Sequence, residues 1–112
     1  GVRGLGARQG MTLDFTKAAV SDLQSIRSYT LERWGAEQEQ SYLDALWQKF
    51  EEILTEPQRW RRRDDLFPDC QIAAHGKHVI LFRIENSVLQ IVRILHGAMD
   101  FPRHLQEDHE AD

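Results

Sequence analysis

The stretch GKHVILFRIENSVLQIVRILH, residues 76–96, decides the fold of this chain. It holds two apolar runs, residues 79–84 and 88–95, separated by a short polar turn around Asn86. Asn tolerates a positive φ, so we expect a tight connection between two strands. Another apolar run, residues 70–74, lies just upstream beyond a glycine turn. The sequence therefore predicts a three-stranded antiparallel meander.

The segment before the meander begins with a short apolar run and continues at helical spacing. Residues 12–15 predict a strand, and Thr16 is a suitable N-cap because its hydroxyl can accept a hydrogen bond from a free backbone N–H. The next residues recur every three or four positions, which places them on one helical face: Ala19, Leu23, Ile26, Thr30 and Trp34. Gly35 is expected to end this helix by taking a left-handed conformation.

A second periodic segment predicts a second helix. Its apolar side comprises Tyr42, Leu43, Leu46, Phe50, Ile53 and Leu54. Pro57 is expected to stop it, because proline lacks an N–H and clashes with the preceding turn. With so short a link at Gly35, the two helices should form an antiparallel hairpin. The predicted class is α+β: an N-terminal strand, a two-helix hairpin, the meander forming one sheet, and a short C-terminal tail.

Composition limits the chain to one domain of ordinary globular character. It has 112 residues, of which 41% are hydrophobic and 29% charged. The longest run of purely aliphatic and aromatic residues, 79–82, is far shorter than the roughly 20 residues of a membrane span. The single cysteine, Cys70, allows no internal disulfide, which fits a cytoplasmic protein. We therefore expect a cytoplasmic location and no membrane contact.

The two ends of the chain differ from the middle. Residues 1–10 carry four of the seven glycines and no periodicity, so we interpret them as a cloning remnant, upstream read-through or a disordered leader before Met11. Residues 11–105 form the expected domain, and residues 106–112 an acidic disordered tail. The net charge is −4 and becomes −6 without Arg3 and Arg8. Nucleic acid is therefore an unexpected primary ligand, because binding phosphates needs clustered cations.

The histidines raise two questions: whether they bind a metal, and whether one of them acts as a base or a stacking group. His75, His78, His104 and His109 match no standard zinc spacing, so no metal and no cofactor are expected. His96 follows an apolar strand, where it could be a base or a stacking group; a capping or hydrogen-bonded structural role is the favoured reading.

A basic run and two tryptophans are the other candidates. The run mixes cations with an aromatic ring, as nucleic-acid grooves do: Arg59, Trp60, Arg61, Arg62 and Arg63. Asp64 and Asp65 follow at once, so an exposed loop that faces a partner protein or solvent is favoured over an RNA site. Trp34 and Trp47 fall on or beside the apolar stripes, and packing is favoured over a ligand platform. No phosphate loop or nucleophile elbow is present.

Several local strings occur in one order along the chain: Asp22-Leu23 with Ile26, Tyr29 and Trp34-Gly35; then Tyr42, Leu46, Phe50, Leu54 and Pro57; then GKHVILFR from Gly76; and IVRILH from Ile91 with Met99-Asp100. Together they resemble the ParE branch of the RelE/ParE toxin superfamily, over about residues 12–105. The resemblance implies the fold given above.

The resemblance also implies a function. ParE-like toxins are associated with inhibition of DNA gyrase and with neutralisation by a ParD-like antitoxin. Such an antitoxin is expected to lay an amphipathic segment along the groove between the hairpin and the sheet. For antitoxin binding we single out Trp34, Trp47, Arg59, Trp60, Arg61, Arg62 and Arg63. For target binding we single out His96, Met99, Asp100, Phe101 and Arg103, because Met99, Phe101 and Arg103 lack obvious core partners.

Two alternatives stay open at this stage. One is a RelE-like messenger-RNA endoribonuclease, which needs a base, an acid and cations around the phosphate. The residues that could serve are at most His78, Arg83, Arg93 and His96, of which the two arginines have a structural alternative. Gly97 stands where such nucleases place an arginine, and the late tyrosine is missing. The other alternative is a non-toxic binding module with the same fold.

Overall fold

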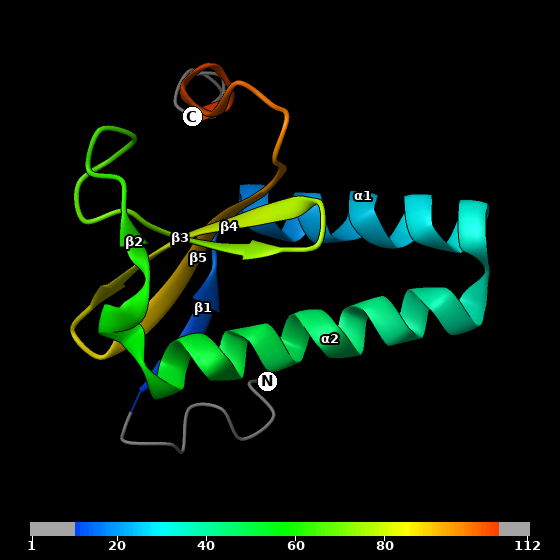
Figure 1. Cartoon of the computed structure of the whole chain (residues 1–112), viewed down its shortest axis with the longest axis horizontal. Helices are drawn as coiled ribbons and strands as arrows, with labels where there is room; N and C mark the ends of the chain where they lie inside the picture. The colour runs from blue at the N-terminus through cyan, green and yellow to red at the C-terminus, as the bar shows by residue number, and fades with distance from the viewer. Residues whose placement is uncertain (1–10, 106–112) are drawn as a thin grey trace.

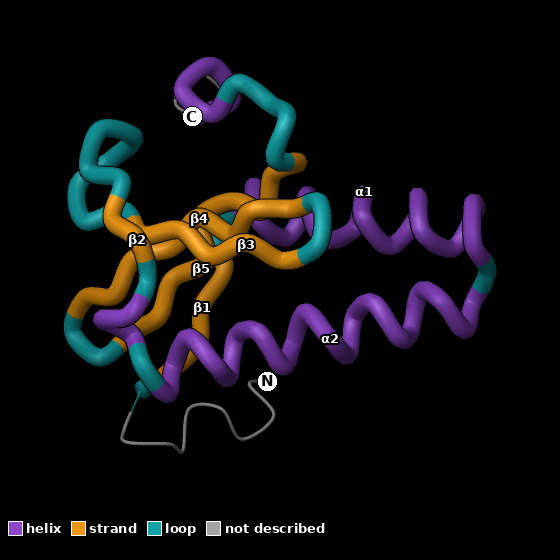
Figure 2. Tube along the Cα trace, in the orientation of Figure 1, coloured by secondary structure: helices purple, strands orange, loops and turns teal. Residues whose placement is uncertain are grey.

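The computed structural model describes residues 11–105 of the chain. Figure 1 shows a sheet beside a long helical hairpin that reaches well past it, and Figure 2 marks the same elements by type. In chain order the elements are β1 (Thr12–Phe15), α1 (Lys17–Trp34), α2 (Ala36–Thr55), the 3₁₀ turn η2 (Pro57–Arg59), β2 (Arg61–Arg62), β3 (Gln71–His75), β4 (His78–Glu85) and β5 (Val88–His96). The predicted α+β order is confirmed.

The sheet has five strands in the order β1-β5-β4-β3-β2. Strands β3, β4 and β5 form the predicted antiparallel meander. The N-terminal strand lies parallel to β5, with Thr12 opposite Val88 and Phe15 opposite Ile91, so the sheet is mixed. β2 is an addition: part of the basic run, expected as a loop, pairs with β3 at the sheet edge. Two residues of extended backbone give too little periodicity to be recognised in a sequence.

The turns follow the predicted chemistry. Gly76 has φ 59° and Asn86 has φ 51°, and Ser87 beside it has φ 62°. The hydroxyl of Thr16 accepts from the amide of Ala19, which confirms the N-cap of α1. Gly35 has φ 93° and links α1 directly to α2. This short link keeps the helices antiparallel, as the sequence predicts.

Residues on the two faces of the sheet belong to different clusters. The main core lies between the sheet and the helices and includes Phe50 of α2, Ile80 and Phe82 of β4, and Ile91 and Ile94 of β5. Ile91 and Ile94 are three residues apart, an odd spacing for one face of a strand. The register shift between Leu81 and Phe82 explains it, because a β-bulge in β5 reverses the alternation.

A smaller cluster covers the other face. Its buried members are Cys70, Leu81 and Leu95, joined by partly buried residues: Leu66, Phe67, Ile72, Val79, Phe101 and Leu105. No helix of residues 11–105 is long and apolar enough to cross a membrane. The predictions for residues 1–10 and 106–112 lie outside the described residues.

Candidate functional site

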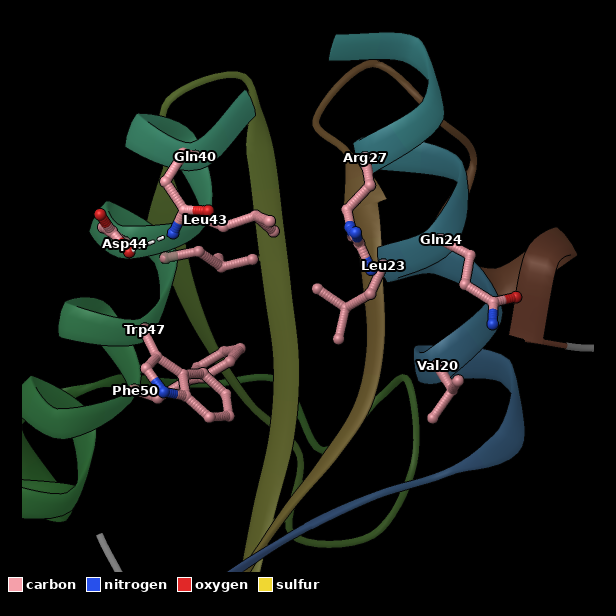
Figure 3. Close-up of a pocket in the computed structure, with 10 residues that line it drawn as sticks. Val20, Leu23, Gln24, Arg27, Gln40, Leu43, Asp44, Trp47 and Phe50 are labelled. Atoms are coloured by element: carbon pink, nitrogen blue, oxygen red, sulfur yellow. Dashed lines mark hydrogen bonds between the residues drawn. The ribbon is translucent and has the colours of Figure 1, made fainter. Parts of the chain in front are cut away.

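An open groove with a volume of about 380 Å³ lies between α1 and α2. Figure 3 shows Leu23 of α1 and Leu43 and Trp47 of α2 pointing toward one another across it. The other apolar lining residues are Val20, Leu46 and Phe50, and the polar ones are Gln24, Arg27, Gln40 and Asp44. The lining comes from the two helices alone. This groove differs from the one that the resemblance implied between hairpin and sheet, since both of its walls are helices.

The two helices that form the groove bury different sets of side chains. α2 buries Leu46, Phe50, Ile53 and Leu54 under the sheet, whereas α1 buries only Ala19, Ile26 and Thr30. Trp47 and Phe50 line the groove and meet edge-on at 5.3 Å, and Phe15 stacks on Trp47 at 6.1 Å. Trp47 is thus a partly buried packing residue that also lines the groove.

Polar contacts hold the rim in place. The guanidinium of Arg27 on α1 contacts the carboxylate of Glu39 on α2 at 3.2 Å. Along α2, Gln40 donates to Asp44 at 2.9 Å. Both contacts are solvent-exposed and contribute little stability. They order the rim without covering the apolar floor.

The apolar wall on α1 continues beyond the groove. Val20, Leu31 and Trp34 are exposed by 43%, 47% and 64%. Their spacings of eleven and three residues place them on the same helical face, along about 21 Å of helix axis. The prediction that Trp34 packs in the core or between the helices is wrong. Its end of the hairpin lies beyond the sheet (Figure 1), and the guanidinium of Arg33 lies 5.9 Å from its ring.

The basic run forms its own ion pairs. Arg62 contacts Asp64 at 2.7 Å and Asp69 at 3.2 Å, and Arg63 contacts Asp65 at 2.8 Å. The hydrogen bond from Arg62 holds the pKa of Asp64 below its ordinary value. These cations are therefore less available to an acidic partner than the sequence suggests.

The first two residues of the basic run, Arg59 and Trp60, contact α2. Arg59 contacts Glu52 at 3.3 Å, and its guanidinium lies 4.8 Å from the ring of Trp60. The ammonium of Lys49 lies 5.0 Å from the same ring. Arg61 is exposed on the edge strand β2. Trp60 is therefore a partly buried residue at the core margin, not an exposed anchor.

The segment after β5 is more ordered than the expected tail. Residues 101–105 are helical, and the carboxylate of Asp100 accepts from the amide of Arg103 at the start of this turn. Phe101 packs on the second cluster, so the expectation that it lacks core partners is wrong. Met99 is 42% exposed, and Arg103 is exposed. The sequence signal that we missed is the apolar pair Phe101 and Leu105, one helical turn apart.

Arg93 is a structural residue. Its guanidinium donates to both carboxylate oxygens of Asp22 on α1, at 2.7 and 2.8 Å, and approaches the carbonyl of His104 at 3.5 Å. The same carboxylate accepts from the amide of Ile94 at 2.9 Å. Beyond Phe15 no strand among residues 11–105 pairs with this side of β5, so Asp22 satisfies a backbone donor that β1 does not reach.

Among the potential nuclease residues, the two arginines are held by other side chains. Arg83 donates to Gln90 at 2.8 Å, and Arg93 is held by Asp22. His78 and His96 do lie together, with ring centroids 5.8 Å apart, and the hydroxyl of Tyr42 is 2.6 Å from Nδ1 of His78. The hydrogen bond to Tyr42 was not foreseen, because it joins residues 36 positions apart. No group of three or more metal-ligating side chains is arranged to hold a metal ion within residues 11–105.

Fold and groove together define a small α+β domain with a mixed sheet and an open, apolar, rimmed groove between two helices. Residues 13–101 match the family model of the ParE toxin of type II toxin–antitoxin system, parDE. The chain belongs to this family, and it is a toxin of the type II toxin–antitoxin class.

Relatives and solved structures agree with this assignment. Toxin ParE1 of Mycobacterium tuberculosis is 30% identical over 89 residues, which cover 79% of this chain and 91% of that protein. Toxin ParE1 of Caulobacter vibrioides is 32% identical over 90 residues, covering 80% and 93%.

Two solved structures share the fold. A structure of the chromosomal ParDE system from P. aeruginosa has a TM-score of 0.65 at 19% identity and covers 77% of this chain and 95% of that one. The RelBE2 toxin–antitoxin complex from Mycobacterium tuberculosis has a TM-score of 0.53 at 23% identity, covering 77% and 96%.

Proposed function

We propose that this toxin inhibits DNA gyrase in the cytoplasm, without catalysis of its own, and is neutralised by a ParD-like antitoxin bound along α1 and α2. The observation that carries the antitoxin part is the groove with its extended apolar wall. Val20, Leu31 and Trp34 expose a stripe that a soluble domain usually covers. An amphipathic helix of about 14 residues matches the stripe of about 21 Å, at 1.5 Å per residue.

The gyrase part rests on family membership and on one surface. Met99 and Arg103 are exposed in the segment that follows His96 at the end of β5, and Asp100 accepts from the amide of Arg103 there. A methionine and an arginine on an ordered turn are typical interface anchors. Phe101 supports this surface from below by packing on the second cluster. We assign target binding to Met99, Arg103, His96 and Asp100, with Phe101 as their support.

The absence of catalysis is supported by how the cations are used. Cleavage by 2′-hydroxyl attack needs cations directed at the phosphate. Arg93 is bound to Asp22, and Arg83 to Gln90. The chain's charge of −4 also opposes approach to the ribosome.

The groove is tested with two charged substitutions on opposite faces of α1. Val20→Asp puts a carboxylate into the groove wall, and Tyr29→Asp puts one on an outward position that is 61% exposed. With the neighbouring antitoxin gene co-expressed, Val20→Asp should weaken binding by about 10- to 100-fold, as for an interface anchor. Tyr29→Asp should bind like wild type. Equal binding by both variants would contradict the groove assignment.

The target is tested with purified gyrase. Wild-type toxin should inhibit supercoiling at micromolar concentration, and Met99→Ala with Arg103→Ala should not, while antitoxin binding is kept. Primer extension on ribosome-bound transcripts should show no new 5′ ends. Discrete cuts in the ribosomal A site would favour the endoribonuclease instead.

A further inference from the structure

Three imidazoles form a row across one end of the sheet. In the strand register His75 of β3 lies opposite His78 of β4, and His78 lies opposite His96 of β5. The rings of His78 and His96 meet at 5.8 Å with an angle of 77° between their planes. Each histidine is two residues along its strand from a member of the main core, so the row faces the helices. The gyrase and antitoxin assignments use only one of these residues.

Helix α2 contacts the row through one side chain. The ring of Tyr42 lies 5.3 Å from that of His75 and 5.8 Å from that of His78. Burial raises the pKa of Tyr42 to about 12, so the phenol keeps its proton. It can therefore donate to Nδ1 of His78, at 2.6 Å, in the neutral tautomer that carries its proton on Nε2. This bond connects α2 to the end of β4.

The turn after β5 depends on the third imidazole. Nδ1 of His96 accepts from the amide of Ala98 at 3.2 Å. The adjacent amide of Gly97 donates to the carbonyl of Lys77 at 2.8 Å. A proton on Nδ1 of His96 would remove the acceptor for Ala98, because both nitrogens of an imidazolium are donors. The same bond makes His96 a poor metal ligand, since a ligating Nε2 would require the proton on Nδ1.

We propose that the histidine row, His75, His78 and His96, is a proton-operated latch. While the imidazoles are neutral, it holds α2 and residues 97–100 on the end of the sheet. When they gain protons, the two hydrogen bonds change direction or break, and adjacent positive charges push the row apart. Both attachments then loosen together.

The charges around the row support this mechanism. The pKa of His78 is below its ordinary value, mainly because of burial and then because of the nearby His96 and His75. Asp22 of α1 acts in the opposite direction. The pKa of His75 is lowered by burial and by Lys49 of α2. The folded state therefore holds fewer protons than the unfolded chain, where histidine titrates near 6.5. Stability is highest above that pH and falls as pH decreases toward the lower folded values.

The latch is tested first by NMR titration of the full chain, following the Cε1–H signal of His78. In His96→Gln the neighbouring charge is gone, and the midpoint of His78 should rise. At the observed ring separation of 5.8 Å, Coulomb's law gives a rise of about 0.5 to 2 pH units between water-like and protein-like dielectric constants. His104→Gln, outside the row, is the control and should leave the midpoint where it is. An unchanged midpoint in His96→Gln would overturn the proposal.

Amide hydrogen exchange tests the opening itself. After correction for the intrinsic rate, lowering the pH from 7.5 to 5 should reduce protection at Ala98 and around Tyr42 in the wild type. In the variant His78→Gln with His96→Gln, protection at these amides should not depend on pH. If that variant does not fold, His96→Gln alone should remove the pH dependence at Ala98. Protection in the wild type that is constant across this range would show that no latch exists.

Discussion

Asp22 is the residue whose loss should damage the fold most for its size. Its carboxylate receives three hydrogen bonds: two from Arg93, at 2.7 and 2.8 Å, and one from the amide of Ile94 at 2.9 Å. The two side chains of the ion pair are only 14% and 11% exposed. Asp22→Ala leaves a nearly buried guanidinium without its main counter-charge and a backbone donor without an acceptor.

The expected cost follows from these contacts. Removing one partner of a buried ion pair costs about 3–5 kcal/mol, and an unpaired N–H adds about 1 kcal/mol or more. Arg93 keeps its approach to the carbonyl of His104 at 3.5 Å, so the guanidinium retains one partner and the cost lies toward the lower end of this range. We expect a loss of about 3–4 kcal/mol of unfolding free energy, which corresponds to a fall in Tm of about 12–30 °C for a domain of this size.

Urea unfolding followed by tryptophan fluorescence measures the effect. Asp44→Ala is the matched control, because Asp44 is an exposed helix carboxylate whose hydrogen bond comes from Gln40 alone. It should cost less than about 0.5 kcal/mol. A loss below about 1 kcal/mol in Asp22→Ala would refute the reasoning, since it would mean that water satisfies Arg93 without difficulty.

Three further predictions concern single features. Burial raises the pKa of Cys70 to about 12. Ellman's reagent at pH 8 should therefore react slowly with the native protein and rapidly in urea. Equal rates would show that the thiol is accessible. Thr16→Ala removes the N-cap of α1 and a 2.7 Å hydrogen bond to the carbonyl of Val92, and should lower the unfolding free energy by about 1–2 kcal/mol. Thr55→Ala, in an exposed position, is the control and should not lower it. Gly35→Ala forces a side chain into φ 93°, and we expect a cost of about 1–3 kcal/mol in thermal unfolding; no change would mean that the link between the helices relaxes freely.

Local chemistry made most of the fold predictable from sequence. Thr16, Gly35, Gly76 and Asn86 mark element ends by their own conformational preferences, and each does so in the structure. Strand β2 and the bulge in β5 were not predictable, because both depend on pairing between distant segments. The parallel pairing of β1 with β5 is of the same kind.

The candidate site was less predictable than the fold. The groove depends on how far apart two helices lie, and apolar periodicity says which face is covered but not which part of it stays open. Trp34 has the spacing of a core residue, yet the hairpin extends past the sheet there and leaves it 64% exposed. In the basic run the sequence places Asp64 and Asp65 next to the arginines, but it does not show which pairs form: Arg62 with Asp64, and Arg63 with Asp65.

The parallel pairing of β1 with β5 also bears on how the toxin is made. Thr16 at the end of β1 bonds to Val92, 76 residues later, so the first strand has no partner until nearly the whole domain has been synthesised. At translation rates of about 5–20 residues per second, that interval lasts about 4–15 s. A contact so distant in sequence also slows the search for the native state. The newly made toxin therefore passes through a period in which its first helix is available but its sheet is incomplete.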